Sequence, residues 1–247
     1  EYTFHKESTQ TSTKYKKENS SSTHDYSDKI IVTGATGGLG RELLRLLNTT
    51  AIGTSRTKSQ ENIFLFKDIV DLEQENDFTN IKGIIHCAWP GLDNEPLLNL
   101  DKENEGPKRY LTDPIKETML LAQLLSRKGC EHAPLILVGS TASQPGRHAY
   151  KSPLYSLSKS MIPTLTQILS LELAKTKQKC FSVVFDMLDG GMNKSMNNLT
   201  KVGHEDRMPF LRIPSMEEAA KQILWTLNND SYLSNGAVIN LTGGAIP

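Results

Sequence analysis

A tyrosine and a lysine, Tyr155 and Lys159, stand four residues apart in a stretch with the pattern of a helix start. Residues at this spacing share one helix face, with about 5–6 Å between their Cβ atoms. An ammonium group there favours the phenolate and would lower the tyrosine pKa from its usual value of about 10. Ser140 closes an apolar run upstream and adds a hydroxyl donor. Together with a glycine-rich turn, these side chains suit the reduction of a carbonyl group.

The glycine-rich turn spans 33–40, with the sequence TGATGGLG, between an apolar run and an amphipathic segment. Glycines let the backbone turn tightly and approach a pyrophosphate, and the next helix presents its first N–H groups to that anion. A strand before the turn and a helix after it distinguish a dinucleotide-binding turn from an ordinary one. We therefore expect a nicotinamide cofactor here.

The choice between NAD and NADP depends on the residues about twenty positions later, where enzymes that use NAD usually carry an acidic residue. This chain has Thr54, Ser55 and Arg56 there, and no carboxylate. A hydroxyl and a guanidinium suit a 2′-phosphate, so the sequence predicts NADP(H). The alternative interpretation makes Arg56 a solvated loop cation.

From Lys29 onward, short apolar runs alternate with amphipathic segments. This alternation predicts a single α/β domain, a Rossmann-type, doubly wound parallel sheet of about seven strands flanked by helices. Asp113, Ser152 and Ser215 are expected N-caps, the last in a capping box with Glu218. We expect strands at 29–34, 51–56, 62–68, 83–89, 134–140, 181–186 and 237–241, and helices at 41–48, at 113–129, from 153 onward and at 215–229.

Residues 1–28 are rich in Ser, Thr and Lys and poor in large apolar side chains, so little compensates the entropy of ordering them. We interpret them as a flexible polar arm or linker. Residues 29–247 then form the dinucleotide-binding domain. Because the chain begins with Glu rather than Met, an N-terminal fusion to another domain is one interpretation of the arm.

Composition excludes several classes of function. The 28 basic and 28 acidic residues balance, so no net field attracts nucleic acid or an anionic membrane. No apolar run approaches the about 18 residues of a membrane span, and no signal-peptide core is visible. Cys87, Cys130 and Cys180 lie far apart, which indicates reduced thiols and no metal site. We expect a cytoplasmic protein with a small-molecule substrate.

The turn at 33–40, Ser140, the Tyr-x-x-x-Lys pair and a terminal NGAVINLTGG at 235–244 resemble, in this order, the short-chain dehydrogenase/reductase family. The resemblance covers 29–247, and the compact length is similar to the single-domain branch. It implies an NADP-dependent oxidoreductase that forms a homodimer or homotetramer through the helix at 113–129 and the helix that carries Tyr155.

The resemblance also implies roles for single residues. Tyr155 would protonate the carbonyl oxygen, Lys159 would lower its pKa and bind the nicotinamide ribose, and Ser140 would donate to the same oxygen. The implied cofactor contacts are Gly34, Thr36, Gly38, Leu39, Gly40, Ser55, Arg56, Asp68, Ile69, Ala88, Tyr155 and Lys159.

Some positions depart from the family pattern. Where the family has Asn-Asn-Ala-Gly, this chain has 86–89, with the sequence HCAW. Ala88 keeps the small residue beside the cofactor, Trp89 is expected at the rim of the site, and His86 as a hydrogen-bonded core residue. Ser140 also lies slightly farther from Tyr155 than is usual, so Thr141 and Ser143 remain substitutes for its role.

The segments 146–151 and 190–212 should reach the carboxyl edge of the sheet, where substrates bind in such folds. They carry many Lys, Arg and Asn side chains, which suggests an anionic, hydroxylated substrate such as a sugar phosphate or a nucleotide-linked sugar. A polar lid of solvated charges explains them equally well. The candidate substrate contacts are Trp89, Arg147, Asn193 and Lys194.

Two other functions stay open at this point. One is epimerase or dehydratase chemistry on a nucleotide sugar, with the NADP retained and recycled. The other is a non-catalytic NADP-sensing protein. Retention of Ser140, Tyr155 and Lys159 argues against a sensor, which needs no proton donor.

Overall fold

A computed structural model describes residues 26–56, 63–65, 78–100, 105–147, 149, 151–194, 198–228 and 231–245. Most of the arm predicted at 1–28 lies outside these ranges, as do the predicted cofactor contacts Asp68 and Ile69. In the described part of the chain, no helix has the length and apolar character needed to cross a bilayer.

Within the described ranges, seven parallel strands form one sheet in the order β3-β2-β1-β4-β5-β6-β7. This arrangement confirms the predicted fold class. Every predicted strand is present, although β4 ends at His86, three residues before its predicted end. The strands are β1 Ile30–Thr33, β2 Ala51–Ser55, β3 Ile63–Leu65, β4 Gly83–His86, β5 Pro134–Ser140, β6 Lys179–Phe185 and β7 Val238–Asn240.

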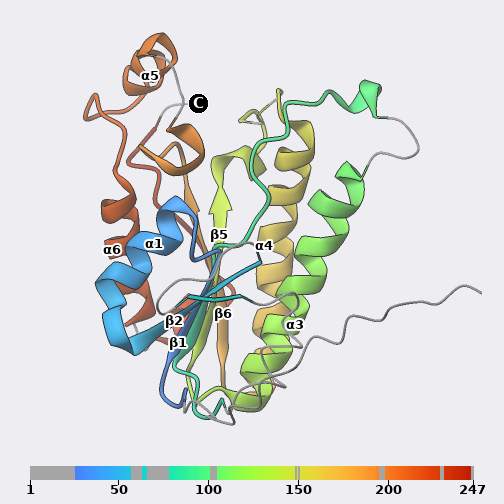
Figure 1. Ribbon diagram of the computed structural model, residues 1–247, viewed down its shortest axis with the longest axis vertical. Helices are drawn as coiled ribbons and strands as arrows, with labels where there is room; N and C mark the ends of the chain where they lie inside the picture. The colour runs from blue at the N-terminus through green and yellow to red at the C-terminus, as the bar shows by residue number, and fades with distance from the viewer. Residues whose placement is uncertain are drawn as a thin grey trace, which may run out of the picture.

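Helices cover both faces of the sheet (Figure 1). On one face lie α1 (Gly38–Leu47) and α6 (Met216–Leu227); on the other lie α3 (Asp113–Lys128) and α4 (Pro153–Leu173). Two buried clusters fill the interfaces, one around Val32 and Phe181 and the other around Leu121 and Leu135. Because both faces are buried, the strands are apolar on both sides, and this explains their nearly continuous apolar sequence.

Of the three predicted helix caps, only one has the expected form. The Ser215 hydroxyl accepts from the Glu218 N–H at 3.1 Å, and the Glu218 carboxylate accepts from the Ser215 N–H at 2.9 Å, which confirms the capping box. Asp113 is not a cap, because a π-helical turn, Lys108–Thr112, leads directly into α3.

The start of α4 is capped from a distant loop. Ser152 occupies the N-cap position but makes no capping bond, and its hydroxyl pairs with Asn94 instead. The Leu154 N–H donates to the Asp93 carboxylate at 3.3 Å. The prediction that Ser152 caps this helix was therefore wrong, since the capping group comes from the loop after β4.

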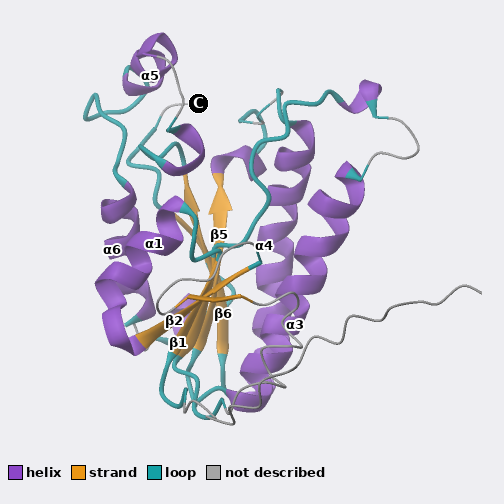
Figure 2. Cartoon of the chain, in the orientation of Figure 1, coloured by secondary structure: helices purple, strands orange, loops and turns teal. Residues whose placement is uncertain are grey.

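The carboxyl ends of the strands point to one edge of the molecule, where the long connections gather (Figure 2). A short helix that the sequence did not predict, α5 (Asn198–Glu205), lies beyond this edge. A 3-10 turn, Thr141–Ser143, follows β5 directly. The candidate site lies at this edge.

Candidate active site

Ser140 and Tyr155 meet at the carboxyl edge of the sheet. Ser140 is the last residue of β5, and Tyr155 lies in the first turn of α4, where only 7% of it is exposed. The Ser140 hydroxyl faces the Tyr155 phenol and acts to lower its pKa. The Ser140 hydroxyl also accepts from the Ala142 N–H at 3.2 Å. This bond lies in the 3-10 turn Thr141–Ser143, within the segment between Ser140 and Tyr155.

The two alternatives to Ser140 point elsewhere. The Thr141 hydroxyl donates to the Asp186 carboxylate at 2.6 Å. The Ser143 hydroxyl donates to the Ser140 carbonyl at 2.7 Å. Both side chains therefore support the turn around Ser140 rather than replace its hydroxyl.

Lys159 lies one helical turn beyond Tyr155 and is buried, with 5% of it exposed. Its Nζ donates to the Val138 carbonyl at 2.9 Å and lies 5.8 Å from the centroid of the Tyr155 ring. Burial disfavours the ammonium form and lowers the pKa of Lys159 to about 7.

The electrostatics of Tyr155 differ from the prediction. Burial raises the pKa of the Tyr155 phenol, and the hydrogen bond with Ser140 acts in the opposite direction. The Lys159 amino group is directed at the Val138 carbonyl. The net direction of the tyrosine pKa is therefore upward, opposite to the predicted one.

The glycine-rich turn packs closely against the segment after β4. Gly34 has a φ of +65°, and a Cβ added there would lie 2.8 Å from the backbone nitrogen of Ala88. The Ala88 N–H donates to the Thr33 hydroxyl at 3.2 Å, and that hydroxyl also pairs with the His86 ring at 2.7 Å. His86 is thus the hydrogen-bonded core residue that the sequence predicted.

The turn also leaves the first N–H groups of α1 without a side-chain cap, since the N-cap is Gly37. Gly38, the first residue of α1, lies close to the loop after β6: a Cβ added to it would lie 2.8 Å from the Cα of Gly191. Glycine at both positions lets these two loops approach each other at the edge of the sheet.

The end of β2 carries the residues predicted to select the cofactor. Ser55 is buried with its hydroxyl 3.3 Å from that of Thr36, and Arg56 is exposed. Sequence reasoning missed a second cation, Arg41, which donates to the Thr36 carbonyl at 2.7 and 3.1 Å. Its signal was a basic residue immediately after the last glycine of the turn.

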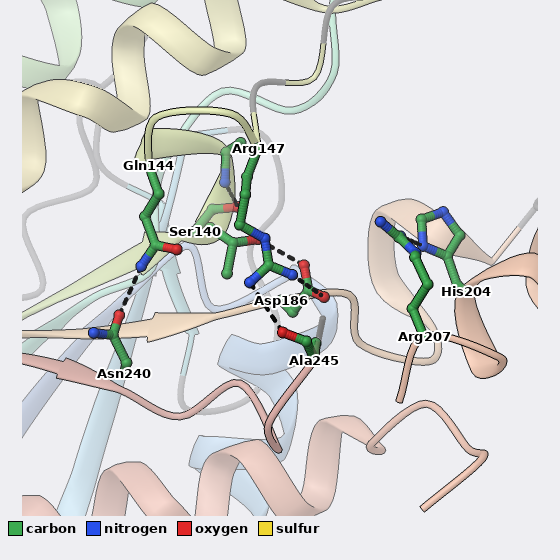
Figure 3. A network of polar contacts seen from close by, with 10 residues as sticks. Ser140, Gln144, Arg147, Asp186, His204, Arg207, Asn240 and Ala245 are labelled. Carbon is green, nitrogen blue, oxygen red and sulfur yellow. Dashed lines mark hydrogen bonds and ion pairs between the residues drawn. The ribbon is translucent and has the colours of Figure 1, made fainter. Parts of the chain in front are cut away.

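Two of the predicted substrate contacts, Arg147 and Asn193, form hydrogen bonds within the protein. Arg147 is half-buried, donating to the Asp186 carboxylate at 3.2 Å and to the Ala245 carbonyl at 3.3 Å (Figure 3). The Asn193 amide donates to the Leu188 carbonyl at 3.0 Å, and the Lys194 side chain is exposed. Asp186, which holds both Arg147 and Thr141, gave no signal in the sequence.

Trp89 is partly buried beside Lys159. Its ring centroid is 5.1 Å from the Nζ of Lys159, and its indole N–H donates to the Ser158 hydroxyl at 2.7 Å. In the described residues no group of three His, Cys, Asp or Glu side chains could hold a metal ion.

Comparison with known proteins gives relatives in sequence and in structure, although no family model matches the chain. The chain is 24% identical over 243 residues to L-xylulose reductase of Caenorhabditis elegans, an alignment that covers 90% of this chain and 97% of the relative. It is 24% identical over 246 residues to ipsdienol dehydrogenase of Ips pini, with 84% and 95% covered.

Solved structures share the fold. A short chain dehydrogenase family protein from Francisella tularensis superposes with a TM-score of 0.73 at 22% identity, covering 88% of this chain and 98% of the other. A variant of ElxO with NADPH bound gives a TM-score of 0.68 at 18% identity, with 88% and 98% covered. Together with the curated relatives, these matches show that the chain is similar to short-chain dehydrogenases and reductases and shares their compact, single-domain α/β fold.

Proposed function

We propose that this protein reduces a carbonyl group of a polar substrate with NADPH. The observation that carries the proposal is the meeting of Ser140, at the end of β5, with Tyr155, in the first turn of α4, while Lys159 is buried one helical turn beyond the tyrosine. A polarising hydroxyl, a proton donor and a buried amine at the carboxyl edge of a Rossmann-type sheet are the groups that carbonyl reduction requires.

The glycine-rich turn fits a dinucleotide. Gly34 adopts a conformation that favours glycine, and the N-terminus of α1 has no side-chain cap and no acidic residue in its first turn. Such a terminus offers free N–H groups and a positive dipole end to a pyrophosphate. Gly34, Gly38 and Gly40 would line this part of the site, and Ala88 would lie beside the ribose.

Three features support NADP(H) rather than NAD(H). Ser55 and Thr36 present hydroxyl groups beside the turn, Arg56 is an exposed cation at the end of β2, and Arg41 lies against the turn itself. A guanidinium binds a phosphate through charge-assisted, bidentate hydrogen bonds. A structural relative is also known with NADPH bound.

When bound, the nicotinamide supplies a hydride to the carbonyl carbon. This chain's own residues handle the oxygen. The Ala142 N–H donates to the Ser140 oxygen, and the serine hydroxyl would donate its hydrogen to the carbonyl oxygen of the substrate. Tyr155 donates its phenolic proton to that oxygen, and Lys159 offsets the charge left on the phenolate.

For the substrate, the structure favours a neutral polar molecule over a phosphorylated one. Several of the cations that suggested an anionic substrate form ion pairs within the protein. In addition, one relative is a reductase of L-xylulose, a ketose. The pairs are Arg147 with Asp186, Lys201 with Asp189, and Arg212 with Glu218.

The test follows NADPH absorbance with purified protein and three substrate groups: free ketoses, ketose phosphates and apolar ketones. We expect the highest kcat/KM for free ketoses. The matched control is Tyr155→Phe, which should reduce turnover by about 10²–10⁴-fold and leave NADPH binding, followed by fluorescence, nearly unchanged. Tightly bound NADP that is never consumed would instead indicate epimerase or dehydratase chemistry.

A further inference from the structure

Trp89 stands where the family pattern has a glycine, and its ring lies 5.1 Å from the Nζ of Lys159. We propose that Trp89 is a positioning residue, whose indole face holds the Lys159 amino group in place and in its charged form. This inference rests on the proposed function, because it assigns the indole to the proton-transfer machinery of that same site.

Among the residues that the structure describes, no carboxylate compensates the charge of Lys159. The ionisable groups that face Lys159 are His86 and Cys87 from the end of β4 and Tyr155 from its own helix. Burial lowers the pKa of His86 to about 3 and raises the pKa of Cys87 to about 12, so both groups are neutral near pH 7.

Tyr155 is neutral there too, because burial raises the pKa of its phenol. In the described part of the chain, the ammonium is therefore stabilised by the Val138 carbonyl and by the two aromatic rings. Indole has the most favourable face of the aromatic side chains for a cation, and the attraction grows when water is excluded.

Hydrogen bonds through Ser158 and Tyr110 fix the orientation of the indole. The Trp89 N–H donates to the Ser158 hydroxyl at 2.7 Å, and this hydroxyl donates to the Tyr110 carbonyl. The Tyr110 hydroxyl then donates to the carbonyl of Gly91, two residues after Trp89, at 2.8 Å.

Ser158 and Tyr110 are both buried, with 0% and 4% exposed. Rotation of the indole away from Lys159 would therefore leave buried polar groups unpaired, which is costly. The ring edge also meets the His86 ring, at 5.5 Å between centroids. Such an arrangement holds the indole face in one orientation toward the lysine.

The experiment changes the indole electronically without changing its packing. Trp225 lies on α6 with 65% exposed, so a Trp225→Phe background leaves Trp89 as the sole tryptophan. In this background, tryptophan is replaced biosynthetically by its mono-, di- and trifluorinated forms, which weaken the π face step by step. The pKa of Lys159 is followed by NMR in protein with labelled lysine, with Lys159→Arg used to assign the signal.

We expect the pKa of Lys159 to fall with each added fluorine, by about one pH unit over the series, since a desolvated cation–π contact is worth roughly a tenfold change in equilibrium. The alkaline limb of kcat should move down by the same amount. Trp89→Leu should lower this pKa at least as far, and Trp89→Phe should lower it less.

A lysine titration that stays the same across the fluorinated series would overturn the inference, because those proteins keep the same packing. A titration that shifts while the pH profile of kcat does not would overturn the positioning role. If no carbonyl compound is reduced by the parent protein, the proposed function fails, and the NMR titration still decides the contact between Trp89 and Lys159 by itself.

Discussion

At the scale of a single residue, burial of the Lys159 amino group lowers the stability of the folded protein. Its amino group is buried, and its pKa falls from the ordinary 10.5 to about 7. The native chain then binds fewer protons than the unfolded chain between these two values, so stability rises with pH in this window. Stability should decrease as the pH falls from about 10.5 to about 7 and should not change further from this cause below it.

Lys159→Met keeps the apolar stem and removes the amine. At pH 7 we expect a melting temperature several degrees above that of the parent protein, since about 1 kcal/mol corresponds to roughly 2–4 °C at this chain length. Calorimetry between pH 7 and 10 measures both effects. Parallel stability curves for the two proteins would show that burial of the amine is not costly.

At the same scale, the proposed preference for NADPH depends on Arg56. Arg56→Ala should raise the KM for NADPH by about tenfold or more and change the KM for NADH little, because a charge-assisted bond to a phosphate is worth about 1.5–3 kcal/mol. Steady-state kinetics with both cofactors measure the ratio. Equal changes in the two KM values would mean that Arg56 does not contact the 2′-phosphate.

At the scale of elements, α4 depends on the loop after β4 for its first turn. The Asp93 carboxylate caps this helix across 61 positions of sequence, whereas the box at α6 joins residues three positions apart. This difference explains what the sequence could predict. The box between Ser215 and Glu218 is a local pattern, but no local pattern reveals a cap that arrives from another loop.

Asp93→Ala and Ser215→Ala therefore form a matched pair of cap deletions. Each should cost about 0.5–2 kcal/mol and lower the melting temperature by a few degrees. Only Asp93→Ala should also reduce kcat, because its helix carries Tyr155 in the first turn. A comparable loss of kcat in both variants would mean that global stability, rather than the α4 start, limits the activity.

At the scale of the whole molecule, the sheet and its helices were predictable because buried strands are apolar on both faces and helices follow at regular intervals. The contacts among the loops on the substrate side of the sheet were not predictable. Arg147 looked like a free cation in a loop, yet it pairs with Asp186, 39 positions away, and with the tail at Ala245. Such pairings depend on how loops meet above the sheet, which periodicity does not encode.

The outer face of α4 supports the predicted homo-oligomer, which remains a proposal. Leu157, Ile168 and Leu171 are 44%, 49% and 73% exposed along this helix. Leu171→Asp should shift the protein toward smaller species in light scattering after size-exclusion chromatography, because it places a charge in the proposed contact. Trp225→Asp, at a 65% exposed residue of α6 on the opposite face of the sheet (Figure 1), serves as the control. Identical masses for Leu171→Asp and the parent protein would contradict this interface.

The bond from Arg147 to the Ala245 carbonyl ties the loop between Ser140 and Tyr155 to the tail of the chain, and the Gln144 amide adds a second tie to Asn240 at 2.9 Å. Immobilising the protein on a solid support through residues that follow Ala245 would therefore pull on the loop that borders the proposed proton donor. Attachment at the amino-terminal edge of the sheet would leave that loop unloaded, and it is the better geometry for a surface-bound biosensor.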